Sequence, residues 1–194
     1  MTSSFSRGLK AETMDQAMVC RDALPRRGTL ACEKRRREMR RDRQTHLRER
    51  VETDPELNAI VTGTWRAILE NLPPPPPEEV ARAHFKALLD QVAGDVSKIR
   101  ARGGEVVFIR PPSRDFFREV ERKVAPRERV WEPVVGAAGA VGVHFEDYPA
   151  LSDVRTPEWS HIATEDKGRW TRALVGILRE VMTKRDLQRA EIGS

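Results

Sequence analysis

A glutamate and a histidine, Glu158 and His161, stand three residues apart, with Trp159 and Ser160 between them. A neutral imidazole acts as a general base when a nearby carboxylate orients its other ring nitrogen and stabilises the cation that forms. A separation of three residues in a turn lets the two side chains meet. The spacing permits His161 to be a base with Glu158 as its orienting acid, but E-x-x-H often occurs by chance, and the alternative is a surface or capping histidine.

The elements around this pair are expected to hold it at the rim of a sheet. Residues 141–145 form an apolar run that predicts a buried strand. After the pair, Thr164 predicts a helix N-cap, and apolar residues recur at helical spacing from Trp170 to Val181. Loops that follow the carboxyl end of a strand carry the active sites of open α/β sheets, so this placement favours a functional role for His161.

Helices and strands alternate along the chain before this block. Asp54 and Pro55 predict a helix start, and five consecutive prolines, residues 73–77, predict an extended linker. The elements expected next are a helix over residues 78–102, a strand over 105–110, a helix over 113–124 and a short segment over 132–140. Together with the later strand and helix, this order is typical of an α/β fold with a parallel sheet and a right-handed crossover.

The basic residues of the chain are concentrated near its start. Residues 1–50 hold fourteen Arg or Lys and seven Asp or Glu, whereas the whole chain has a net charge of +5. Residues 1–30 lack periodicity and are expected to be irregular. Residues 31–51 contain strong helix formers without an apolar face, which predicts either a solvated helix or one that binds nucleic acid or an anionic surface. No aromatic residue interleaves the arginines to stack on bases, which favours the solvated helix.

The expected organisation has four segments. They are a basic, disordered or helical arm (1–52), an amphipathic helix with a polyproline linker (53–77), an α/β portion (78–186) and a tail (187–194). The two cysteines, Cys20 and Cys32, are too few for a zinc site and are expected to be reduced thiols. His144, Glu146, Asp147 and His161 could also suggest a metal site, but this interpretation is disfavoured.

Three runs in the C-terminal part resemble a known family. Residues 145–151 (FEDYPAL), 157–162 (PEWSHI) and 169–174 (RWTRAL) resemble the C-terminal block of SGNH hydrolase-like proteins, the GDSL-type esterase and acyltransferase superfamily. Residues 102–112 are similar to the penultimate strand of that family. The last motif of the superfamily is D-x-x-H, whose Asp and His complete a Ser-His-Asp triad. The resemblance covers about residues 78–182 and implies the same roles for Glu158 and His161, with Glu in place of Asp.

The nucleophile motif of the superfamily does not occur in this sequence. The family's serine lies in Gly-Asp-Ser, and the nearest imitation here is Gly94-Asp95-Val96-Ser97, inside a predicted helix. Ser113 follows a predicted strand but is better explained as the N-cap of the next helix. Because a base without a nucleophile cannot perform acyl transfer, the resemblance implies a C-terminal half of such a protein that is inactive as given.

The resemblance also sets expectations for fold and partners. It implies an incomplete flavodoxin-like three-layer α/β/α fold with a short parallel sheet, no cofactor, and an ester or acylated envelope polysaccharide as the substrate of intact relatives. Two parallel strands do not make a stable sheet, so we expect the isolated chain to be partly unfolded or to self-associate through an open edge.

The sequence shows no apolar run of membrane-spanning length and no signal peptide, which predicts a cytoplasmic chain. Intact relatives are often membrane-anchored or exported. The lack of such a segment suggests that an upstream portion is missing or that the gene start lies elsewhere.

Overall fold

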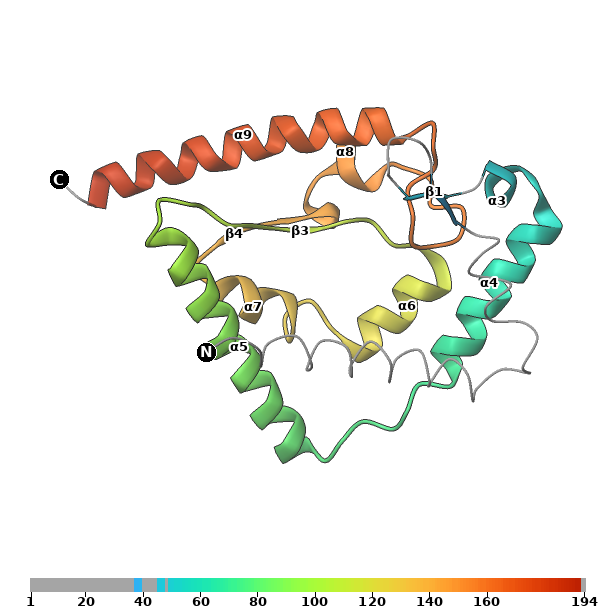
Figure 1. Ribbon diagram of the computed structural model, residues 1–194, viewed down its shortest axis with the longest axis horizontal. Coiled ribbons are helices and arrows are strands. Elements are labelled where there is room, and N and C mark those ends of the chain that lie inside the picture. Colours follow the sequence, from blue (N-terminus) through green and yellow to red (C-terminus); the bar gives the residue numbers. More distant parts are fainter. Residues whose placement is uncertain (1–36, 40–44, 48, 193–194) are drawn as a thin grey trace, which may run out of the picture. The chain divides into compact units, whose positions relative to one another are not determined.

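The structure, a computed structural model, describes residues 37–39, 45–47 and 49–192 (Figure 1). The chain divides into two compact units, Met1–Pro73 and Pro74–Ser194. The predicted irregular segment over residues 1–30 and both cysteines lie outside the described residues.

The arginine-rich segment of the first unit forms strands where it is described. Strand β1 (Arg37–Met39) pairs in antiparallel fashion with β2 (Thr45–Leu47), with Arg37 opposite Leu47. The prediction of a helix over residues 31–51 is therefore wrong at these positions. The physical reason is that helices in proteins are stabilised mainly by packing an apolar face, and this segment has none.

Helix α4 (Pro55–Glu70) starts where the sequence predicts. The carboxylate of Asp54 accepts hydrogen bonds from the N–H groups of Glu56 and Leu57, both at 3.1 Å, and Pro55 occupies the first turn. The preceding short helix α3 (Glu49–Thr53) contributes Val51 to a small apolar core. The other members of that core are Val61, Leu57 and Trp65, so α3 and α4 pack on each other.

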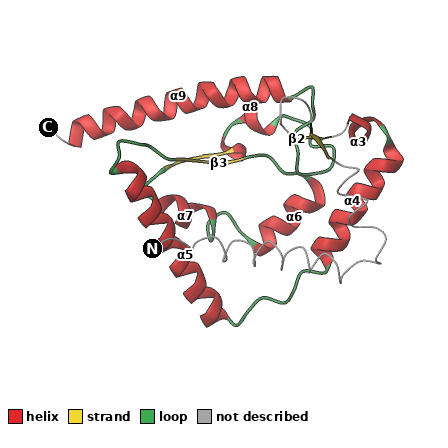
Figure 2. Ribbon diagram, in the orientation of Figure 1, coloured by secondary structure: helices red, strands yellow, loops and turns green. Residues whose placement is uncertain are grey.

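The second unit is a mixed helix and strand structure built on one parallel pair of strands (Figure 2). Strand β3 (Val107–Arg110) pairs with β4 (Val141–His144) in register from Val107 opposite Val141 to Arg110 opposite His144. The remaining elements are α5 (Glu78–Arg100), α6 (Asp115–Val124), α7 (Trp131–Ala137), the 3-10 helix η1 (Phe145–Asp147), α8 (Pro149–Ser152) and α9 (Lys167–Ile192). The α/β class and the parallel pairing are confirmed.

Helices contact both faces of β4. Val143, fully buried, belongs to a core cluster that includes Leu174 of α9. The neighbouring residue Gly142 faces the opposite way, as successive residues of a strand do. A Cβ atom at Gly142 would lie 3.0 Å from a methyl group of Val135 in α7, so the glycine allows α7 to approach. Figure 1 shows α9 on one side of the strand pair and α7 on the other.

Two arginines tie the helices together at the amino ends of the strands. The guanidinium of Arg100, at the end of α5, donates to the carbonyl oxygens of Ala138 and Gly139, each at 2.9 Å. Arg185 of α9 donates to the same Gly139 oxygen at 3.1 Å and pairs with Glu105 at 3.2 Å. The turn before β4 is thereby linked to both long helices, at the opposite end of the sheet from the Glu158 loop.

Two predicted helix caps are wrong. Helix α6 begins after Arg114 rather than Ser113, because the Ser113 hydroxyl donates to Glu121 and accepts from Arg110 instead of capping the helix. Helix α9 begins at Lys167, after Thr164, because the carbonyl of Asp166 accepts the first helical hydrogen bond.

None of the described helices combines the length and the apolar composition of a membrane-spanning segment.

Candidate functional site

The structure brings the predicted acid and base together. The Nδ1 atom of His161 contacts the Oε1 atom of Glu158. The side chain of Glu158 is fully buried, whereas that of His161 is 37% exposed. A carboxylate removed from water needs hydrogen-bond donors, and the imidazole is one of them. The pair therefore has the arrangement of an orienting acid and a base whose ring is still partly open to solvent.

Ser160 completes a group of three side chains. Its Oγ atom lies 3.0 and 3.1 Å from the two carboxylate oxygens of Glu158 and 2.9 Å from Nδ1 of His161. In a Ser-His-acid triad, the serine and the acid engage opposite ring nitrogens. Because Ser160 and Glu158 both face Nδ1, Ser160 does not stand where a nucleophile would.

The loop that carries the pair is fastened beside the carboxyl end of β3. The backbone N–H of Arg114, four residues past the end of β3, donates to the carbonyl of Trp159 at 2.9 Å. The rings of Trp159 and Phe116 also lie near each other, with centroids 6.0 Å apart. The loop thus lies at the edge of the sheet where α/β proteins bind ligands, as the sequence predicts.

Two residues at this fastening have left-handed backbone conformations. Trp159 has a φ of 73° and Asp115 a φ of 50°, and they are the non-glycine residues with positive φ in the described ranges. Such conformations cost free energy and persist where the surrounding structure holds them, often at functional sites. At Trp159 the unusual turn directs its two neighbours, Glu158 and Ser160, into one hydrogen-bonded group.

Asp166 closes the base of the loop that carries Glu158 and His161. One carboxylate oxygen of Asp166 accepts the backbone N–H of Arg155 at 2.9 Å, and the other accepts the Arg169 guanidinium at 3.0 Å. The Arg155 N–H, followed by the Arg169 guanidinium, holds the pKa of Asp166 below its usual range. The N–H of Ala163 closes the same loop by donating to the Arg155 carbonyl at 2.8 Å.

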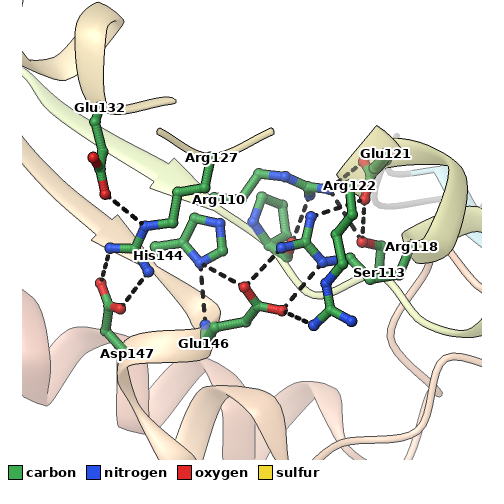
Figure 3. A network of polar contacts seen from close by, with 11 residues as sticks. Arg110, Ser113, Arg118, Glu121, Arg122, Arg127, Glu132, His144, Glu146 and Asp147 are labelled. Atoms are coloured by element: carbon green, nitrogen blue, oxygen red, sulfur yellow. Dashed lines mark hydrogen bonds and ion pairs between the residues drawn. The ribbon is translucent and has the colours of Figure 1, made fainter. Parts of the chain in front are cut away.

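A second polar network lies at the carboxyl ends of the strands (Figure 3). Glu146 receives hydrogen bonds from Arg118 and Arg122 at 2.7 Å each, and Arg127 forms a two-point contact with Asp147 at 2.6 and 2.9 Å. The disfavoured metal interpretation named these acids, which here are paired with guanidinium groups. In this network Ser113 contacts Glu121 and Arg110, not His161.

His144 is the buried imidazole of this network. It is 2% exposed, and its Nδ1 atom accepts the backbone N–H of Glu146 at 3.2 Å. Burial and then the charge of Arg127 lower the pKa of His144 to about 4. Although burial raises it, the hydrogen bonds from Arg118 and Arg122 lower the pKa of Glu146 to about 2. His144 is therefore neutral and Glu146 ionised at neutral pH.

Sequence reasoning missed this network and the part played by Ser160. The arginine contacts of Glu146 and Asp147 join residues 20 to 28 positions apart, such as Arg127 with Asp147, which no local pattern reveals. The available signal was the i, i+4 spacing of Arg118 and Arg122, which places both on one helix face. Ser160 stood inside the pattern, but its direction depends on the conformation of Trp159.

Comparisons of the chain with protein-family models, with curated proteins and with solved structures find no match.

Proposed function

We propose that the C-terminal unit is an SGNH-hydrolase-like portion that carries the base and the orienting acid of an acyl-transfer site. The observation that supports this best is the contact between the fully buried carboxylate of Glu158 and Nδ1 of His161. A proton on Nδ1 is held by the carboxylate, which makes Nε2 the basic nitrogen. The same carboxylate stabilises the imidazolium that forms when Nε2 takes a proton.

In this proposal the C-terminal unit is part of a flavodoxin-like three-layer α/β/α fold. The support is the parallel β3–β4 pair with α7 and α9 against opposite faces of β4. Each strand has one neighbour among the described residues, and parallel sheets generally have more strands. We expect the sheet to be extended at an open edge, by a segment that bears a serine or by a second copy of this chain.

The chemistry follows from that completed sheet. His161 would remove the proton of a serine hydroxyl as the serine oxygen attacks an ester carbonyl, and would return it to the leaving alkoxide. The substrate class is an ester, including an acylated polysaccharide. Since the sequence contains no Gly-Asp-Ser, the chain alone is proposed not to turn esters over.

The alternative function, nucleic acid binding by the arginine-rich segment, gains no support from the fold. Residues 37–39 and 45–47 form short strands, not the basic helix on which that interpretation depended.

Acylation of His161 by diethyl pyrocarbonate tests the proposed base. We expect Glu158→Gln to slow this reaction roughly threefold to tenfold, because a neutral amide does not support the positive charge that the ring gains on attack. Peptide mass spectrometry measures the rate at each histidine. His84 provides an internal control, since it is exposed on α5 and its rate should not change.

Equal acylation rates of His161 in the wild type and in Glu158→Gln would contradict the proposal.

Hydrolysis of p-nitrophenyl acetate should remain at background for the wild-type chain and for His161→Ala. Turnover by the wild-type chain that is abolished in His161→Ala would show that the chain supplies its own nucleophile. That result would overturn the proposal that the chain alone does not hydrolyse esters.

A further inference from the structure

Ser160, the third side chain of the site, takes no part in the proposed proton transfers. We propose that Ser160 is a positioning residue, which fixes the tautomer of His161 by donating its hydroxyl proton to Glu158. The inference rests on the proposed function, because it assigns a residue of the same site. The Oγ atom of Ser160 lies 3.0 and 3.1 Å from the carboxylate oxygens of Glu158 and 2.9 Å from Nδ1 of His161.

Proton counting selects one arrangement of these contacts. A serine hydroxyl carries one proton and has lone pairs that accept others. If Ser160 donated to Nδ1, that nitrogen would carry no proton, and its contact with the Glu158 carboxylate would place two acceptors against each other. If Ser160 donates to Glu158, the proton on Nδ1 meets acceptors on both Glu158 and Ser160. All three contacts then join a donor to an acceptor.

The burial of Glu158 explains why the second donor matters. The carboxylate is fully buried, so each missing hydrogen bond leaves charge without compensation from water. The Ser160 hydroxyl lies within hydrogen-bond distance of both carboxylate oxygens of Glu158, whereas the imidazole contacts Oε1. Ser160 thereby keeps the carboxylate in place as an acceptor for Nδ1–H. The consequence is that Nε2 of His161 is the basic nitrogen, although Ser160 does not touch it.

Two other residues provide references for this inference. Ser152, in α8, donates its hydroxyl to the backbone carbonyl of Pro149 at 3.2 Å, so Ser152→Ala is a matched loss of one hydroxyl outside the site. The buried His144 should show the opposite tautomer, because its Nδ1 accepts the Glu146 N–H and its proton must lie on Nε2. One spectrum therefore contains both tautomers.

The test is the ¹⁵N NMR spectrum of the imidazole nitrogens in the full chain, recorded where His161 is neutral. We expect the Nδ1–H tautomer in the wild type, in Ser152→Ala and in Ser160→Thr, which retains the hydroxyl. Ser160→Ala should lower the ratio of Nδ1–H to Nε2–H at His161 roughly fivefold to tenfold, the effect of one hydrogen bond. The signals of His144 should not move, which shows that the variant is folded.

An unchanged tautomer ratio in a folded Ser160→Ala protein would overturn the inference and leave the proposed function standing. An Nε2–H tautomer at His161 in the wild type would instead contradict the proposed function, because Nε2 could not then act as the base. A ratio that falls in Ser160→Ala and is restored in Ser160→Thr supports the positioning role. If Ser160→Thr fails to restore the ratio, the hydroxyl is not the group responsible and the inference fails.

Discussion

Acidification from pH 7 to pH 4 should destabilise the C-terminal unit by about 3 kcal/mol through His144 alone. The pKa of this histidine falls from 6.5 to about 4 in the folded protein, first because of burial and next because of Arg127. Between these values the unfolded chain binds a proton that the folded chain does not. Folding stability due to His144 is therefore complete above pH 6.5 and is lost as the pH falls toward 4.

Burial and the charged groups near His144 together set the size of this loss. Burial disfavours the protonated form of His144 most strongly. The positive charges of Arg127 and Arg118 also disfavour it, whereas Glu146 and Asp147 favour it. Protonation of Nδ1 would also break its hydrogen bond from the Glu146 N–H. Glu146 adds a loss of the same sign at lower pH, since its pKa falls from 4.5 to about 2.

Urea unfolding at a series of pH values, followed by circular dichroism, measures the effect. His144→Asn retains an acceptor near the position of Nδ1 but does not titrate, so its stability should depend far less on pH between 6.5 and 4. His84→Asn, on the exposed side of α5, should follow the wild type. If wild type and His144→Asn lose stability in parallel, the buried neutral state of His144 is refuted.

Replacement of Leu151 by alanine should cost about 3 kcal/mol of unfolding free energy. Leu151 is fully buried in α8 and belongs to the same core cluster as Val143, Phe145 and Leu174. It joins the short helix after β4 to helix α9. Removing its side chain leaves a cavity that α8 and α9 can close only in part, so both lost burial and the cavity destabilise the unit.

Leu187→Ala is the matched control for this prediction. Leu187 lies on α9 and is 61% exposed, so its loss should change the unfolding free energy by no more than about 0.5 kcal/mol. Thermal or urea unfolding of the two variants gives the comparison. Equal effects of the two substitutions would show that the cluster around Leu151 is not the core of the unit.

The regular elements of the C-terminal unit could be predicted because local signals agreed with the fold. The apolar spacing of residues 78–100 and the short β-branched runs of β3 and β4 each favour the structure that packing also requires. In the first unit, the Asp54-Pro55 cap fixed the start of α4 for the same reason.

The predicted helix caps at Ser113 and Thr164 are wrong because long-range partners outweigh local preferences there. Ser113 has a typical capping side chain, but Glu121 and Arg110 compete for its hydroxyl. Thr164 could have capped α9, yet Asp166 is fixed by the Arg155 N–H and takes the cap position. A sequence pattern cannot reveal such competition, because the competing group arrives through the tertiary fold.

The acid and the base of the candidate site were predictable from the sequence, but the participation of Ser160 and the geometry were not. The spacing of Glu158 and His161 predicts that they meet, and the structure brings them together. The three-way contact of Ser160 depends on the positive φ of Trp159 and on the Arg114 hydrogen bond to the same loop. Neither feature has a signature in the local sequence, since tryptophan rarely adopts that conformation.

The proton NMR spectrum of the His161 ring tests most directly whether a buried carboxylate holds this imidazole for proton transfer. We predict a far-downfield Nδ1–H resonance in the wild-type chain that moves upfield in Glu158→Gln, because the neutral amide forms a weaker hydrogen bond than the carboxylate. A resonance at the same position in both proteins, or a wild-type ring whose proton lies on Nε2, would contradict the account.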